Sequence, residues 1–255
     1  MDKRDSATKM AAQLKSLGIA PGDTILVHSS FKALGLVPGG IETVIQGLLQ
    51  AIESDGTLLI PALSWALRPP EAFNVRTTPT NIGAISEYFR TREGTFRSVH
   101  PTHSVCAVGK RTHEMLDEHH LDSTPCGPHS PFSKLTQTDA KIVMLGCGLT
   151  PSTTMHALEE QAGAPYVFGP SYAFTLTDWS GATYEKEYKT HGFSVHGYAQ
   201  RYDRLMELGT GSFLRKGKVL EADTFILKTR ELREAVLKKM SENPLFFVDK
   251  VKAAP

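Results

Sequence analysis

The sequence predicts an α/β protein with a central mixed sheet flanked by helices and with antiparallel hairpins in the C-terminal third. From residue 24 to residue 163, short apolar runs alternate with segments of helical periodicity, which is the pattern of a sheet covered by helices. Further on, the runs 174–178 and 183–188 flank a turn at 179–181, which is typical of a hairpin. The 255 residues are enough for a substantial core, and we expect one domain over residues 1–255.

The elements of the front half follow from apolar spacing and from turn residues. Apolar side chains three or four apart predict helices, and short apolar runs closed by Gly or Pro predict buried strands. The irregular stretch over residues 62–80 is expected to be a long functional loop. In chain order we expect a helix over 6–17, a strand over 24–27, a helix around 41–49, a strand over 57–60, a helix over 81–92, a strand ending at Val108 and a helix over 110–120.

The stretch from Lys141 to Gly163 carries the most chemical information. Residues 142–145 form a short apolar run closed by glycines, which predicts a buried strand and a tight loop. The helix that follows carries His156 and Glu159, three apart and therefore on one face. An imidazole can accept a proton near neutral pH, and a neighbouring carboxylate can hold its tautomer. The alternative is a surface helix with an ordinary His-x-x-Glu pair, which is common on helices.

The last third of the chain is rich in strand and turn signals. In addition to the hairpin described above, we expect a helix over 197–208 and a helix over 231–240. A second hairpin is expected from the runs 211–214 and 218–220, with its turn across 216–217.

Charge and cysteine content narrow the class of protein. The formal net charge is +1, so no general attraction to nucleic acid or to an anionic membrane is expected. The three cysteines, Cys106, Cys126 and Cys147, have no CxxC spacing, which favours free thiols in a reducing compartment. The polar start lacks the apolar segment of a signal peptide, and no uncharged run is long enough to span a bilayer. We therefore expect a cytoplasmic protein.

A group of histidines raises the question of a metal site. Their spacing matches neither HExxH nor a Cys/His finger, so we expect no metal there and interpret them as solvated side chains on a polar helix. These histidines are His100, His103, His113, His119 and His120.

Five segments of the chain, in their order and spacing, resemble one known family. They are VHSSFKALGLVPGG at 27–40, NIGAISEYFR at 81–90, RSVHPTHSVCAVG at 97–109, PCGPHSPFSKL at 125–135 and VMLGCGLTPSTTMHALEE at 143–160. They are similar to the corresponding segments of the aminoglycoside 3-N-acetyltransferase family. The likeness is strong over roughly the first two thirds of the chain and looser afterwards, so it implies the family's fold as well as its chemistry.

The resemblance implies an enzyme that moves the acetyl group of acetyl-CoA to an amine of an aminoglycoside antibiotic, without a metal. It places His156 as the general base, Glu159 as its acidic neighbour and Thr153 as a third catalytic residue. A small-molecule amine is therefore the expected partner, and a homodimer the expected assembly. Residues 150–152, Thr-Pro-Ser, depart from the Asp-Ser-Asn-like run that the family usually has before this threonine.

The resemblance also implies two segments that hold acetyl-CoA. The first is the hydroxyl-rich loop after the first strand, and the second precedes the strand that ends at Val108. By resemblance, the cofactor-binding residues are Ser29, Ser30 and Phe31 in the loop, and Arg97, Ser98, His100 and Pro101 in the second segment.

Three other functions remain open from the sequence. Cys147 follows a strand and could serve as the nucleophile of a thiol-dependent hydrolase with His156 as its base. The chain could bind CoA without catalysis, or acetylate an amine that is not an antibiotic. A polycationic aminosugar would favour a cleft with carboxylates, for which the candidates are Glu160, Asp178, Glu185, Glu187 and Asp203.

Overall fold

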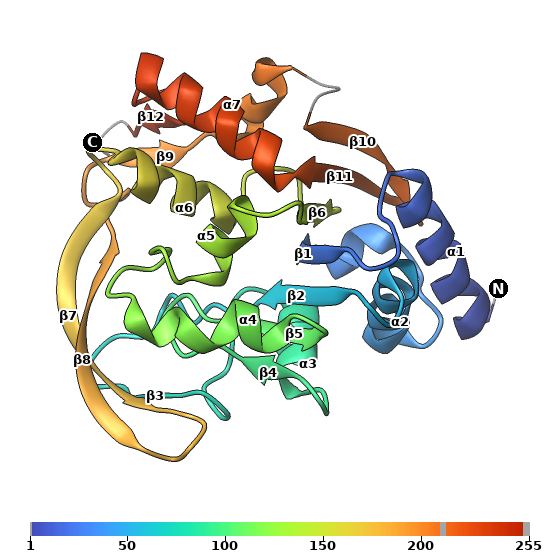
Figure 1. Cartoon of the computed structure of the whole chain (residues 1–255), viewed down its shortest axis with the longest axis horizontal. Helices are drawn as coiled ribbons and strands as arrows, with labels where there is room; N and C mark the ends of the chain where they lie inside the picture. The colour runs from blue at the N-terminus through green and yellow to red at the C-terminus, as the bar shows by residue number, and fades with distance from the viewer. Residues whose placement is uncertain (1, 210–212, 252–255) are drawn as a thin grey trace.

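A seven-stranded mixed sheet forms the centre of the molecule. The computed structural model describes residues 2–209 and 213–251. The strand order is β10-β11-β6-β1-β2-β5-β4; β6, β1 and β2 run parallel in the middle, and antiparallel strands follow on both sides (Figure 1). The predicted fold class is confirmed. The strands are β1 (Thr24–Ser29), β2 (Thr57–Pro61), β4 (Phe96–Arg97), β5 (Val105–Gly109), β6 (Lys141–Leu145), β10 (Leu214–Val219) and β11 (Ala222–Lys228).

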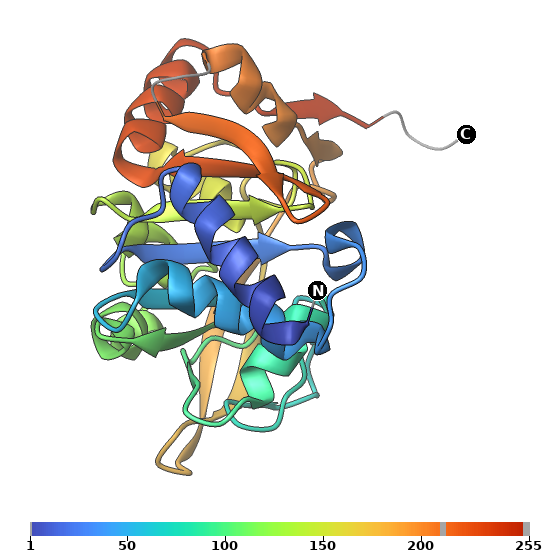
Figure 2. The same ribbon diagram turned by 90° about the vertical axis from the view of Figure 1, so that its right-hand side faces the viewer.

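Side-chain alternation along the buried strands gives the sheet two apolar faces. Ile25 and Val27 pack on one face with α1, α2 and α3, whereas Leu26 packs on the opposite face with α4 and α5. Figure 1 shows α7, α6, α5 and α4 following one another down the molecule, and Figure 2 shows α1 beside α2. The helices are α1 (Lys3–Ser16), α2 (Gly40–Ile52), α3 (Ala84–Thr91), α4 (Thr112–Leu116), α5 (Pro131–Thr136), α6 (Thr153–Ala162) and α7 (Thr229–Glu242).

A long antiparallel hairpin curves along one side of the molecule (Figure 1). It consists of β7 (Phe168–Thr177) and β8 (Thr183–His191), and β3 (Phe73–Asn74) pairs with β7. In its turn, the Asp178 carboxylate accepts hydrogen bonds from the backbone N–H groups of Ser180 and Ala182. The first predicted hairpin is therefore confirmed, and the far end of β8 places His191 near the end of α6.

The helix predicted over 197–208 is wrong. The segment contains a short strand, β9 (Tyr198–Gln200), and a 3₁₀ helix, Tyr202–Leu208. The strand pairs with β12 (Val248–Lys250), which lies about fifty residues away in the chain, so local apolar spacing carried no signal for it.

The second predicted hairpin has a different turn. β10 continues through Gly217 and the chain reverses at Leu220, whose φ is 53°, before β11 pairs back along β10. Gly217 lies within β10 and not in a turn, and the Leu17 side chain beside it would have to shift to admit a Cβ. Residues 210–212, where part of the predicted first run falls, lie outside the described residues.

Two smaller differences concern the helices. The helix predicted over 110–120 is split into α4 and a 3₁₀ helix at Asp117–Leu121, and a further 3₁₀ helix spans Phe31–Leu34 after β1. Within residues 2–209 and 213–251, no helix combines the length and the apolar character needed to cross a bilayer.

Candidate active site

A crevice opens where the three parallel strands end. In the sheet, β1 lies between β6 and β2. The chain continues from β1 toward β2, away from β6, so the loops after β1 and β6 diverge above the sheet. The Ser30 N–H donates to the Leu145 carbonyl at 2.9 Å and ties the start of the loop after β1 to the end of β6. Gly146 has a φ of 72° and lies against Ala33, with no room for a Cβ. This arrangement places the start of α6 at the crevice.

Two cavities meet at this point and share His156. One, of about 440 Å³, lies over the strand ends and is lined by Ser29, Cys147 and Thr153 among others. The other, of about 420 Å³, extends toward the C-terminal segments and is lined by His191, Phe193 and other residues. The residues that line both cavities are Leu63, Trp65, His156 and Gln200.

His156 is held from behind by a buried carboxylate and a tyrosine, and a second tyrosine holds the carboxylate. Its Nδ1 lies 3.2 Å from Glu159 Oε2 and 2.7 Å from the Tyr202 hydroxyl. The Tyr202 hydroxyl also donates to Glu159 Oε2 at 2.6 Å, and the Tyr166 hydroxyl donates to Glu159 Oε1 at 2.9 Å. The Glu159 side chain is fully buried, whereas that of His156 is 16% exposed. The carboxylate is thus out of reach of a ligand, and the imidazole is within reach.

The hydrogen-bond inventory of this group assigns the tautomer of His156. A tyrosine hydroxyl has one proton, and Tyr202 uses it on Glu159, so the same hydroxyl oxygen can accept from His156 Nδ1. The proton of the neutral ring then resides on Nδ1, and Nε2 keeps its lone pair. An imidazole with this lone pair beside both cavities can take a proton from a bound group.

Two further histidines surround His156 and are kept neutral by burial. Burial, and secondarily the nearby His156, lowers the pKa of His28 to about 3. The same two causes hold the pKa of His191 well below its ordinary value. The His191 ring packs at 4.5 Å from that of His156, between ring centroids, and its Nε2 lies 2.9 Å from Glu160 Oε1. Burial raises the pKa of Glu160 to about 7.

Comparison with known proteins identifies the family. The sequence profile described as aminoglycoside 3-N-acetyltransferase matches residues 26–241. The chain belongs to the aminoglycoside 3-N-acetyltransferase family. A curated relative, aminoglycoside N(3)-acetyltransferase IV of Salmonella sp, is 28% identical over 242 residues, which cover 94% of this chain and 89% of the relative.

Solved structures of this family share the fold. The aminoglycoside acetyltransferase AAC(3)-IVa, in a His-to-Ala variant in complex with a gentamicin, matches with a TM-score of 0.81 and 27% identity over 94% of this chain and 90% of that one. The YokD protein of Bacillus subtilis matches with a TM-score of 0.78 and 28% identity over 93% of both chains. The predicted family is confirmed, and with it the predicted enzyme class, an acetyl-CoA-dependent aminoglycoside N-acetyltransferase.

Within this family fold, the structure brings some of the predicted site residues together at the crevice. Ser29, Thr153 and His156 line the cavity over the strand ends, and Glu159 supports His156 from behind. Ser30 and Phe31 follow Ser29 directly in the loop, although their side chains are not part of the cavity lining within the described residues.

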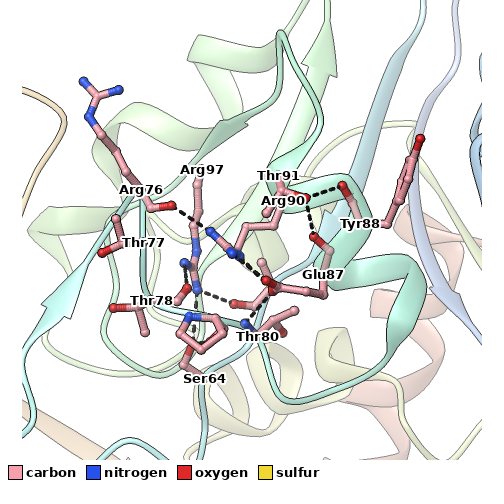
Figure 3. A network of polar contacts seen from close by, with 12 residues as sticks. Ser64, Arg76, Thr77, Thr78, Thr80, Glu87, Tyr88, Arg90, Thr91 and Arg97 are labelled. Atoms are coloured by element: carbon pink, nitrogen blue, oxygen red, sulfur yellow. Dashed lines mark hydrogen bonds and ion pairs between the residues drawn. The ribbon is translucent and has the colours of Figure 1, made fainter.

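Arg97 is located elsewhere, in the wall of the fold. Its guanidinium donates to the carbonyls of Thr78 and Ala62 and to the hydroxyls of Ser64 and Ser104, and only 3% of the residue is exposed. Figure 3 shows this group turned inward, next to the Arg90–Glu87 pair. Desolvation lowers its pKa to about 10, and it remains charged. This guanidinium joins the loop of residues 62–80 to β4 and lines neither cavity, and its predicted contact with acetyl-CoA stays a prediction.

The rest of the second segment is also internal. The Ser98 hydroxyl lies 2.9 Å from His119 Nδ1 and accepts from the Val105 N–H, and His100 Nδ1 accepts from two backbone N–H groups. Ser98, His100 and Pro101 are buried and line neither cavity. They support the fold from inside, and their predicted contact with the cofactor also stays a prediction.

The interpretation of the histidines as solvated is wrong for three of the five. His100, His103 and His119 are buried, and His100 stacks on His119 with 4.9 Å between centroids. His103 extends this row to the His191 ring, also at 4.9 Å. His100 and His119 fill the interior behind the site, and His103 lines the second cavity.

Tyr202, Tyr166 and His191 carried no signal in the sequence that marked them as site residues. Tyr202 lies 46 residues after His156, in a segment predicted to be a helix, so no local spacing connects the two residues. His191 ends a hairpin strand that was predicted from its alternating polar and apolar side chains. That alternation does not indicate which end of the strand lies near α6.

Cys147 lies at the cavity but is poorly suited to act as a nucleophile. It lines the cavity over the strand ends, and burial raises its pKa to about 11. At neutral pH the group is therefore a thiol, whereas the attacking species of a thiol hydrolase is the thiolate.

The five carboxylates predicted to line an acceptor cleft lie outside both cavities. Among the described residues, none of the five lines the two cavities that share His156. Asp178 caps a hairpin turn, Asp203 pairs with Arg201, and Glu160 lies behind His191.

Proposed function

We propose that the protein transfers the acetyl group of acetyl-CoA to an amine of an aminoglycoside, with His156 as the general base. One observation carries the proposal: the imidazole of His156 is a common wall of two cavities of about 440 and 420 Å³. A transfer reaction needs two substrates whose reacting atoms meet at one base, and this arrangement provides that meeting point.

The cavity over the strand ends receives the thioester. Its lining includes Ser29 at the end of β1 and Thr153 from the first turn of α6. Negative charge develops on the thioester oxygen as the amine attacks, and the Thr153 hydroxyl and the N–H groups at the start of α6 can meet that charge. Ser30 and Phe31 support the same loop against the pantetheine arm.

The amine approaches from the second cavity. A protonated amine has no lone pair, so a base must take its proton before or during attack on the thioester carbonyl. Nε2 of His156 accepts this proton, and the buried Glu159 carboxylate stabilises the resulting imidazolium. When the carbon–sulfur bond breaks, the leaving thiolate takes the proton from the His156 imidazolium, so CoA leaves as its thiol and the base is restored.

An aminoglycoside is the first acceptor to test. The family profile covers residues 26–241, and a related structure holds a gentamicin. The whole chain acts as one domain in this proposal, because the cavity linings include residues from β1 through β9. A homodimer and a cytoplasmic location stay predictions, which size-exclusion chromatography and cell fractionation test.

The release of free CoA from acetyl-CoA measures the proposed activity. The assay uses a panel of aminoglycosides and simpler amines, the parent protein, His156→Ala, and His113→Ala as a matched control on an exposed histidine. We expect turnover with the parent and the control and its loss in His156→Ala. Turnover that survives His156→Ala contradicts the assignment of the base, and no turnover with any amine contradicts the activity.

A further inference from the structure

Three side chains with metal-binding chemistry meet behind the wall of the second cavity. Cys126 lies in the loop before α5, Glu160 lies on α6 and His191 ends β8. One ligand atom of each, a thiol sulfur, a carboxylate oxygen and a ring nitrogen, lies within 4.8 Å of the other two. The three residues come from separate segments of the chain, so folding alone creates this cluster.

The donor set fits zinc. A thiolate and an imidazole are ligands that zinc prefers and that magnesium and calcium avoid, and a carboxylate completes many three-residue zinc sites. His191 Nε2 and Glu160 Oε1 are 2.9 Å apart, close to the roughly 3.3 Å between two ligands that each bind tetrahedral zinc at about 2.0 Å. A doubly charged cation with one thiolate and one carboxylate gives a neutral complex, which suits a buried position.

The surroundings already orient the carboxylate. The Thr124 hydroxyl donates to Glu160 Oε2 at 2.6 Å, and the Cys126 N–H donates to Oε1 at 2.8 Å. Such outer contacts fix ligands before a metal binds. Among the described residues, the Cys126 thiol has only a long contact of 3.9 Å to the Thr153 carbonyl, so a metal would replace no strong hydrogen bond of the sulfur.

A third cavity, of about 350 Å³, leads to the cluster from the side of α5. Cys126 and Glu160 are part of its lining, together with polar side chains of Ser133 and Gln137. This cavity is a route by which an ion can reach the ligands and a source of water for a fourth ligand.

We propose that Cys126, Glu160 and His191 bind one zinc ion, with water from this third cavity as the fourth ligand. When zinc binds, it displaces the proton of the Cys126 thiol and the proton shared by His191 and Glu160. Both protons are released to solvent. Because His191 packs against His156, a bound ion would fix the wall of the second cavity without touching the reacting nitrogen.

Cobalt is the probe for this site. The purified full-length protein is treated with a chelator, dialysed and titrated with Co²⁺, and Zn²⁺ is then added as a competitor. We expect one Co²⁺ per chain, a thiolate-to-cobalt charge-transfer band in the near ultraviolet, visible bands of a tetrahedral site, and loss of all bands on addition of Zn²⁺. Co²⁺ bound without the charge-transfer band would overturn the proposal, because the thiolate would not be a ligand.

Cys126→Ser is the decisive variant, and Cys147→Ser is its matched control. Cys126→Ser should abolish the charge-transfer band and weaken Zn²⁺ binding at least tenfold, whereas Cys147→Ser should change neither. A band of parental strength in Cys126→Ser overturns the proposal. Glu160→Gln and His191→Gln keep polar side chains of similar size and serve as further variants if Cys126→Ser does not fold. Each should weaken Zn²⁺ binding at least tenfold. Parental Zn²⁺ affinity in both variants overturns the proposal.

Discussion

Glu159 and Glu160 are neighbours on α6 and meet opposite environments. Glu159 points into the interior, where two tyrosine hydroxyls and His156 surround it. Glu160 points to the loop before α5 and to β8, where a threonine hydroxyl, a backbone N–H and His191 surround it. Consecutive helical residues differ by about 100° in direction, so one helix can supply two separate histidine–carboxylate pairs.

The comparison shows that a histidine beside a carboxylate does not by itself make a catalytic base. Both His156 and His191 line the second cavity, but only His156 also lines the cavity over the strand ends. Position between the two cavities therefore distinguishes the two pairs.

The largest difference in kcat is expected between variants of the two histidines, His156 and His191. His156→Ala removes the base and should lower kcat about a thousandfold, because general-base catalysis contributes about 10²–10⁴-fold. His191→Ala should lower kcat by less than about tenfold, since it changes only the wall of the acceptor cavity. Steady-state kinetics with acetyl-CoA and one aminoglycoside measure both values. Equal losses in the two variants would show that both pairs take part in proton transfer.

The next largest difference in kcat is expected between variants of the two carboxylates, Glu159 and Glu160. Glu159→Gln keeps the size of the side chain but removes the charge that stabilises the imidazolium, so we expect kcat to fall about a hundredfold. Glu160→Gln should lower kcat less than about fivefold, because His191 is not the base. Thermal unfolding of both variants serves as the control for folding. A larger kcat loss in Glu160→Gln would reverse the assignment of the two pairs.

A smaller difference in kcat is expected between variants of the two tyrosines that contact Glu159. Tyr202 contacts both His156 and Glu159, whereas Tyr166 contacts only Glu159. Tyr202→Phe should lower kcat about tenfold and Tyr166→Phe about threefold or less, while each lost hydrogen bond costs about 1 kcal/mol of stability. Kinetics and urea unfolding separate the two effects. Equal kcat values in the two variants would mean that Tyr202 does not set the tautomer.

The smallest effect concerns His28, which lies near His156 and whose buried Nε2 has no hydrogen-bond partner among the described residues. Its pKa is about 3 in the folded state and ordinary in the unfolded chain, so between these values the unfolded state binds the extra proton. Stability should therefore fall as the pH falls below 6.5, by about 1 kcal/mol between pH 6.5 and 5.5 for this group. Urea unfolding of the parent and of His28→Gln measures it, and an identical pH dependence in both would contradict the prediction.

Much of the fold could be predicted because its signals are local. The apolar runs that became β1, β2 and β6 are short and closed by turn residues, and α6 follows a tight glycine loop. β11 was missed although ADTFILK has strand propensity, because its antiparallel pairing with β6 depends on a segment about eighty residues earlier.

The site was only partly predictable for the same reason. The i, i+3 spacing placed His156 and Glu159 on one face of α6, and the structure brings them to 3.2 Å. The resemblance suggested Arg97 as a ligand contact, but the charge of a guanidinium does not indicate whether it faces a ligand or the interior. Its hydrogen bonds to Thr78 and Ala62 are tertiary contacts and have no sequence pattern.

The sequence by itself determined most of the strands and helices from β1 to α6, the shared face of His156 and Glu159, and the family. These depend on backbone geometry within one element and on the spacing of motifs along the chain. Only the tertiary structure decided that Tyr202 holds His156, that Arg97 is buried, and that Cys126, Glu160 and His191 meet. Such contacts join segments tens of residues apart, and their geometry is set by the packing of the whole core.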